Sequence, residues 1–316
     1  MIAALAAHYG LEAVAVASVS DNVVRARTQR GDFAVKTFVA ADLDRAEREA
    51  ALLAHFAAGS PQVRVPALVR TVNGAACARV EDGALVVMSW CTGHQQAYTS
   101  ITEPEWFALG NELAALHTRL DDFSGSLPRA SELDFDLDAG RGAMIADRAR
   151  ALAKDPVRGE VIARYIDARL ALLDVRGPRG LRRPPGAESP IHNDYNQHNY
   201  LFDGTLPPVI LDWEGAIAAT REYEVVRCLN HLPLVAPAHA TAFVTGYRER
   251  RPLDREGLRW AIDRSLLEHA LKSWPLDRWL GEVPGADDAL SGSMEVLHAL
   301  AAGTAQLAAF FGVEEG

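Results

Sequence analysis

Residues 191–214, IHNDYNQHNYLFDGTLPPVILDWE, place polar side chains around two short apolar runs. The first run, NYLF, begins at Asn199, and the second, VIL, ends just before Asp212. Apolar runs bounded by Gly, Pro and Asp are typical of short strands joined by a turn. Such a hairpin would bring Asn199 close to Asp212, with Asp194 on the loop that leads into it.

These three side chains offer oxygen atoms, the ligands that Mg²⁺ prefers when it also binds substrate phosphates. Phosphoryl transfer needs a carboxylate near the attacking hydroxyl, oxygen ligands for Mg²⁺ and a cation on the phosphate oxygens. We therefore predict that Asp194 is the catalytic base and that Asn199 and Asp212 bind the metal.

The N-terminal part of the chain supplies a candidate for the cation. Three strands are expected between residues 14 and 39, and the third contains Lys36. The helix expected next has Glu47 and Glu49 in its middle, and either could form an ion pair with Lys36. The alternative is that all three charges face solvent, as a lone strand lysine and helix acids usually do.

The order of the remaining elements indicates the fold class. Further strands are expected at 63–72 and 75–80, joined as a hairpin through Asn73-Gly74, and at 84–90. A capping box, Thr102-Glu-Pro-Glu105, marks the start of a helix that runs to about residue 120. More helices are expected at about 143–174, 222–232, 239–250, 255–274 and 291–311. Strands first and helices afterwards predict an α+β protein.

Composition excludes several classes of protein. The 316 residues carry a formal charge of −10, which argues against a general nucleic-acid binder. The three cysteines, odd in number and widely spaced, suit a reducing cytoplasm. The N-terminus lacks a basic region before its alanine-rich stretch, and no run of 18 apolar residues occurs, so we expect neither a signal peptide nor a membrane span. The oligomeric state is left open.

The motif His192-Asn-Asp194-Tyr-Asn-Gln-His-Asn199, followed by Val-Ile-Leu-Asp212-Trp-Glu, resembles the signature of the aminoglycoside phosphotransferase and choline kinase superfamily. The resemblance implies a bilobal protein-kinase-like fold. Residues 1–90 would form a strand-rich, nucleotide-binding N-lobe, with an antiparallel sheet and a helix. Residues 91–316 would form a mainly helical C-lobe holding the catalytic loop, the metal site and the substrate-binding helices. One departure is Asn193, because the family often has glycine there.

The same resemblance assigns roles to further residues. It favours Glu49 over Glu47 as the partner of Lys36, and it makes His192 a structural brace of the catalytic loop. The connector after the last N-lobe strand would bind adenine through backbone groups near Ser89 and Cys91. Apart from the resemblance, Glu214 could contact the metal or a substrate amine, or it could be an exposed loop acid. Segments 223–230 and 246–253 also show some likeness to type II homoserine kinases.

These observations lead to one main hypothesis, an ATP- and Mg²⁺-dependent kinase. It would transfer the γ-phosphate to a hydroxyl of a small polar metabolite or antibiotic, such as an amino alcohol, homoserine, a sugar or an aminoglycoside. One alternative is a nucleotide-binding pseudokinase or regulatory module. Another is a metallohydrolase in which His192, Asp194, His198 and Asp212 bind a transition metal.

Overall fold

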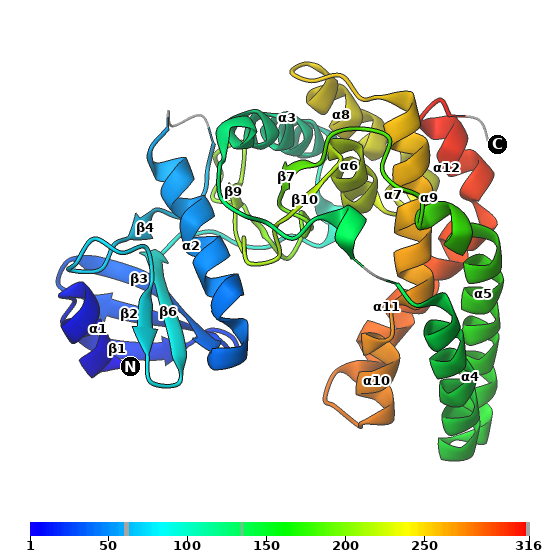
Figure 1. Ribbon diagram of the computed structural model, residues 1–316, viewed down its shortest axis with the longest axis horizontal. Coiled ribbons are helices and arrows are strands. Elements are labelled where there is room, and N and C mark those ends of the chain that lie inside the picture. The colour runs from blue at the N-terminus through cyan, green and yellow to red at the C-terminus, as the bar shows by residue number, and fades with distance from the viewer. Residues whose placement is uncertain (60–62, 134, 314–316) are drawn as a thin grey trace. The chain divides into compact units, whose positions relative to one another are not determined.

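The computed structural model describes residues 1–59, 63–133 and 135–313, and its N-terminal part is built on an antiparallel sheet (Figure 1). The strand order is β1-β2-β3-β6-β4, and β5 also pairs with β6. The strands are β1 (Ala13–Ser18), β2 (Val23–Thr28), β3 (Gly31–Val39), β4 (Leu68–Val69), β5 (Ala78–Val80) and β6 (Gly83–Ser89).

The two faces of this sheet are covered by different helices, α1 (Ile2–Tyr9) and α2 (Leu43–Ala57). Val35 of β3 belongs to the buried cluster that α1 closes, and its cross-strand partner is Val87. Successive side chains of a strand point to opposite faces. Lys36 therefore faces away from α1 and toward α2, where it meets Glu49. Because side chains alternate between the two faces along β3, Lys36 is buried rather than exposed to solvent.

The two strands expected at 63–72 and 75–80 do not pair with each other. A tight turn does form at Asn73-Gly74, where Gly74 has a φ of 80°. However, both β4 and β5 pair with β6, at Leu68↔Met88 and Ala78↔Leu85. The expected hairpin was therefore wrong, because each short segment pairs with β6, which is buried from Gly83 to Met88.

The chain after β6 is mainly helical. The capping box is confirmed: Glu105 accepts a hydrogen bond from the backbone of Thr102, and helix α3 (Glu103–Arg119) follows. The helical patterns expected at about 143–174 correspond to two helices, and Asp155 caps the second of them, which begins at Pro156. The remaining helices are α4 (Leu137–Lys154), α5 (Pro156–Gly180), α6 (Arg221–Leu229), α7 (Leu232–Val235), α8 (Pro237–Arg248), α9 (Arg255–Leu271), α10 (Trp274–Leu280), α11 (Ala286–Ala302) and α12 (Thr304–Phe310). The α+β class is confirmed.

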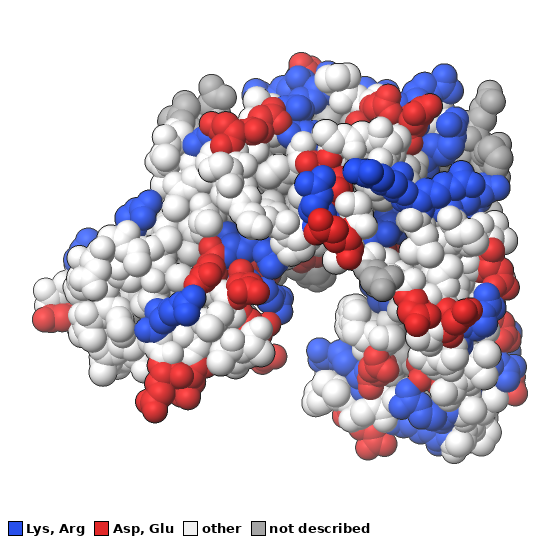
Figure 2. All heavy atoms as spheres, viewed as in Figure 1, with Lys and Arg blue, Asp and Glu red and all other residues white. Residues whose placement is uncertain are grey.

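Two compact units share the chain. The first comprises residues 1–128, 189–218 and 245–251, and the second comprises 129–188, 219–244 and 252–316. The first unit holds the sheet, α1 to α3 and every site residue named above. The division into lobes at residue 90 stays a prediction. Within the described ranges, every helix is too short or too polar to cross a membrane. On the face that Figure 2 shows, basic and acidic side chains are interspersed.

Candidate active site

The hairpin predicted within residues 191–214 is present. Strands β8 (Tyr200–Leu201) and β9 (Val209–Ile210) pair antiparallel, and the N–H of Leu211 donates to the carbonyl of Asn199 at 2.9 Å. Arg64 holds the turn, since its guanidinium lies 2.6 Å from the carboxylate of Asp203. The pairing brings Asn199 and Asp212 to the same end of the hairpin, although thirteen positions separate them in the chain.

His192 ties the start of this stretch to its end. Its Nε2 donates to the carbonyl of Leu211 at 2.7 Å, and its Nδ1 accepts from the N–H of Asp194 at 3.2 Å. A carbonyl only accepts and a backbone N–H only donates, so the imidazole is the neutral Nε2–H tautomer. The ring is buried and lies 4.4 Å from that of Trp213. This geometry supports the brace predicted for His192.

Two residues of the loop adopt the left-handed backbone conformation, Asn193 at φ 66° and Asp212 at φ 63°. Glycine adopts this region freely, and Asn and Asp tolerate it better than other side chains. The loop therefore keeps the shape that glycine would allow at position 193. The side chain of Asn193 adds a bond, since its Nδ2 donates to the carbonyl of Gly215 at 3.0 Å.

The carboxylate of Asp194 is oriented by two amides. Nδ2 of Asn199 donates to Oδ2 of Asp194 at 2.8 Å and to its carbonyl at 2.8 Å. Nδ2 of Asn196 donates to Oδ1 at 2.7 Å. Because the amide nitrogen of Asn199 makes both bonds, its side-chain oxygen is the atom that could bind a cation. Asn196 was not singled out from the sequence, and only its place inside the motif hinted at a role.

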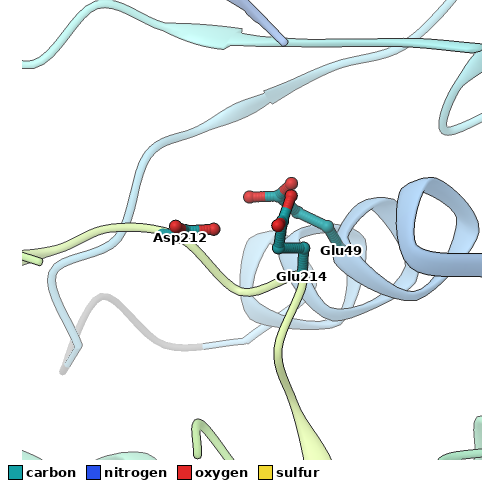
Figure 3. Close-up of side chains that lie close together, drawn as sticks. All are labelled: Glu49, Asp212 and Glu214. Atoms are coloured by element: carbon teal, nitrogen blue, oxygen red, sulfur yellow. The ribbon is translucent and has the colours of Figure 1, made fainter. Parts of the chain in front are cut away.

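Lys36 lies among three carboxylates. Its Nζ is 3.1 Å from Glu49, 2.6 Å from Asp212 and 2.7 Å from Glu214. Figure 3 shows these three acids converging from α2 and from the segment after β9. The Lys36 and Glu49 side chains are almost fully buried, whereas that of Asp212 is 40% exposed. Asp212, which was predicted to bind a metal, thus has a carboxylate that is accessible to solvent.

Burial and charge set the protonation of this group. Burial would lower the pKa of Lys36, but the nearby carboxylates of Glu49 and Asp212 outweigh it and raise the pKa. For Glu49, burial raises the pKa to about 7, and the ammonium of Lys36 opposes that rise. Lys36 is therefore positively charged, and its charge favours the ionised form of Glu49.

The structure distinguishes Glu49 from Glu47. Glu47 pairs with Arg79 on the surface, while Glu49 contacts Lys36 and also accepts the N–H of Trp213 at 3.2 Å. Glu49 therefore joins the lysine to the segment that carries Asp212. The contact with Trp213 could not be read from the sequence, because it joins residues 164 positions apart.

Glu214 is held by two arginines of α2 that the sequence analysis passed over. Arg45 forms an ion pair with its carboxylate, and Arg48 donates to its backbone carbonyl at 2.8 Å. Positions 45 and 48 lie on one side of the helix, which is the only sequence signal for them. Together with the contact to Lys36, these bonds occupy Glu214, and the role in binding a substrate amine stays a prediction.

A cavity of about 600 Å³ opens beside this group. It is lined by Lys36, Glu49, Ser89, Cys91, Asn199 and Asp212, together with apolar residues that include Val23, Met88 and Leu211. The size falls within the range of pockets for small molecules and cofactors. Residues predicted separately, from the sheet, the connector and the hairpin, therefore surround one space.

The connector has few backbone groups left for a ligand. The N–H of Ser89 donates to Ala67 at 2.8 Å, and its hydroxyl accepts the N–H of Ala67 at 2.9 Å. The N–H of Trp90 donates to Asp32 at 3.1 Å. A ligand at the connector would therefore bond the Ser89 carbonyl or the backbone of Cys91.

The histidine-rich metal site of the hydrolase alternative does not form. His192 uses both ring nitrogens inside the loop, and His198 is exposed. Over the described ranges, the acids and histidines that converge closely enough for a metal are Glu49, Asp212 and Glu214. Their three carboxylates offer hard oxygen donors, and Lys36 and the half-exposed Arg45 lie against them. This donor set fits a hard divalent cation better than zinc.

Comparison with solved structures places the fold. The chain aligns with spectinomycin phosphotransferase APH(9)-Ia, solved with ADP and spectinomycin, at 15% identity and a TM-score of 0.65, over 96% of this chain and 97% of that one. The chain also aligns with the amicoumacin kinase hAmiN, solved with AMP-PNP, Ca²⁺ and Ami, at 14% identity and a TM-score of 0.64, over 96% of this chain and 92% of that one. A microcompartment-associated aminopropanol kinase aligns at 17% identity and a TM-score of 0.59, over 95% of this chain and 93% of that one. At such identities the likeness shows the fold, and the kinase-like fold is confirmed.

Sequence comparison supplies the family. No curated protein sequence matches the chain significantly. The model of the phosphotransferase enzyme family, however, matches residues 12–260, which includes the sheet, the connector and the whole catalytic stretch. Because this match covers most of the chain, the protein belongs to the phosphotransferase enzyme family.

Proposed function

We propose that the chain is a small-molecule kinase that transfers the γ-phosphate of ATP to a hydroxyl group, with Asp194 as the base. The observation that carries this proposal is the cavity lined jointly by Lys36, Asn199 and Asp212. These are the cation and the oxygen ligands that phosphoryl transfer requires. The nucleotides bound in solved structures of the same fold support ATP as the donor.

Each residue has a defined task in this proposal. Asp194, held by the amides of Asn196 and Asn199, orients the acceptor hydroxyl and takes its proton. Lys36 exchanges its contacts with Asp212 and Glu214 for the phosphate oxygens and keeps its contact with Glu49. Asn199 and Asp212 would hold Mg²⁺, which supplies charge neutralisation to the phosphates when it is bound. Glu49 keeps Lys36 in position.

Adenine would occupy the apolar end of the cavity, next to Val23, Met88 and Leu211. The N–H and hydroxyl of Ser89 are already bonded to Ala67, so the adenine edge would bond the Ser89 carbonyl and the backbone of Cys91. Replacing the Ser89 side chain should then affect the connector rather than a direct contact with the base.

The proposal specifies a class of acceptors rather than a single compound. Among the solved structures of similar fold, a spectinomycin phosphotransferase binds spectinomycin, an amicoumacin kinase binds Ami, and a third protein is an aminopropanol kinase. An amino alcohol, a homoserine-like compound, a sugar or an aminoglycoside-type antibiotic fits the proposal for this chain. A cytoplasmic location follows if the donor is ATP.

The test is a panel of such acceptors incubated with ATP labelled in the γ-phosphate. Transfer of label to one acceptor, abolished by EDTA and restored by Mg²⁺, is the expected result. A thermal shift with ATP and Mg²⁺ but no transfer to any acceptor would favour the pseudokinase alternative. Hydrolysis of a substrate without ATP, with zinc or manganese bound on purification, would favour the hydrolase.

A further inference from the structure

A second cavity, of about 480 Å³, lies within the helical unit. It is lined by residues 129–133, by residues 181–183 and by Arg264 of α9. None of these residues lines the cavity that holds Lys36. Four of the lining side chains are arginines, and two of them belong to the Arg- and Pro-rich segment that follows α5.

The rims of this cavity are fixed by buried or half-buried partners. The carboxylate of Glu188, 4% exposed, binds Arg129 at 2.9 Å and accepts from the N–H and hydroxyl of Ser131 at 2.7 and 2.6 Å. On the other rim, the indole of Trp260 donates to the carbonyl of Arg182 at 2.7 Å. Both segments are therefore held in place by the rest of the unit.

Arg264 is the buried arginine among the four of the lining, with a side chain only 3% exposed. Its guanidinium donates to Glu268 at 3.1 Å, to the carbonyl of Gly180 at 3.3 Å and to the carbonyl of Ala130 at 3.2 Å. It also stacks on Phe135, 4.3 Å from the ring centroid. These contacts fix the guanidinium of Arg264 at the wall of the cavity.

The charges around the cavity do not balance. Arg129 is paired with Glu188 and also lies 4.0 Å from Glu132, an exposed acid of the lining, and Arg264 is paired with Glu268. Arg182 and Arg183 are exposed, and neither has an ion-pair partner in the part of the chain that the structure describes. In a protein with a formal charge of −10, two such cations beside a concave space form a local site of positive potential.

We propose that this cavity binds a small anionic metabolite through its phosphate or carboxylate groups, with Arg182 and Arg183 as the principal contacts. Planar guanidinium groups match both oxyanions in two-point hydrogen bonding. The cavity volume suits a metabolite rather than a lone ion. This site stands independently of the proposed kinase activity, since it shares no residue with the cavity of Lys36.

Isothermal titration calorimetry of the full chain with inorganic phosphate and with citrate tests the proposal and separates the two oxyanions. We expect at least one of them to bind, and the affinity to fall about tenfold or more in the double variant Arg182→Ala/Arg183→Ala, because bonds to charged groups are lost. The matched control is Arg30→Ala/Arg164→Ala, which removes the same charge from two exposed arginines outside the cavity.

Two results would overturn the proposal. One is the absence of binding by either anion to the unmodified chain. The other is an equal loss of affinity in the cavity variant and in the control, which would mean that net charge alone attracts the anion. Neither result bears on phosphate transfer from ATP, so failure here and failure of the kinase proposal are distinguishable.

Discussion

The ammonium of Lys36 lies 2.6 Å from the carboxylate of Asp212, although 176 positions separate the two residues. Glu49 and Glu214 contact the same ammonium. One lysine thus holds together the sheet, helix α2 and the segment after the catalytic hairpin. Its loss should therefore affect both the stability of this unit and the binding of a nucleotide.

We predict that Lys36→Met destabilises the chain more at pH 8 than at pH 5. Breaking a buried ion pair costs about 3–5 kcal/mol when a charge is left behind. Burial already raises the pKa of Glu49 to about 7, and removing the ammonium raises it further. A carboxyl with a raised pKa contributes stability at low pH that is lost as the pH rises through that pKa.

Urea unfolding at the two pH values measures this effect. The double variant Lys36→Met/Glu49→Gln is the control, because without the carboxylate most of the pH dependence of the penalty should disappear. A penalty for Lys36→Met that is the same at pH 5 and pH 8 would contradict the prediction.

Replacing Asp194 by Asn should lower kcat by about 100-fold or more while nucleotide binding is retained, since a positioned base contributes that much. The side chain keeps its size, but it can no longer accept a proton. The matched control is Asp174→Asn, the same change at an exposed aspartate of α5. Turnover and ATP affinity are measured with the acceptor found in the panel, and unchanged turnover would remove Asp194 from the mechanism.

Position 193 should tolerate glycine better than alanine. Asn193 has a φ of 66°, which costs about 1 kcal/mol or more for a residue with an ordinary Cβ. Both substitutions lose the hydrogen bond to Gly215, so the difference between them reports the backbone alone. We expect Asn193→Ala to be less stable than Asn193→Gly by about 1 kcal/mol in urea unfolding, and equal stabilities would disprove a backbone constraint.

Glu112 in α3 should make stability fall as the pH rises. It is buried and accepts the N–H of Arg64 at 2.8 Å, and burial raises its pKa to about 7 from the ordinary 4.5. The folded chain thus holds this proton more tightly than the unfolded chain. The contribution is present below about pH 4.5 and is lost as the pH rises through about 7.

The variant Glu112→Gln tests this directly, because its amide oxygen can still accept from Arg64 but does not titrate. The decrease in unfolding free energy between pH 5 and pH 8 should be smaller in the variant, by on the order of 1 to 3 kcal/mol. Glu49 contributes to the slope in both proteins and cancels in the comparison. An identical slope would show that Glu112 does not titrate in this range.

The fold class and the main residues of the site could be predicted from the sequence, because short local patterns indicate them. The apolar run of β6, the capping box at Thr102 and the motif around Asp194 each lie within a few residues. The hairpin expected between β4 and β5 was wrong, because these short strands can each pair with more than one partner. Nothing in the sequence of β4 and β5 shows that β6 pairs better with each of them than they pair with each other.

By itself, the sequence determined the composition of the site: Asp194, Asn199 and Asp212 in one stretch, with Lys36 upstream and an acid on the next helix. The family resemblance favoured Glu49 over Glu47, but only the tertiary structure shows this contact and what else surrounds the lysine. Glu49 rather than Glu47 meets Lys36, and Arg45 and Arg48 hold Glu214. The physical reason is that these pairings depend on the rotation of α2 over the sheet, which packing between distant segments sets and no local pattern encodes.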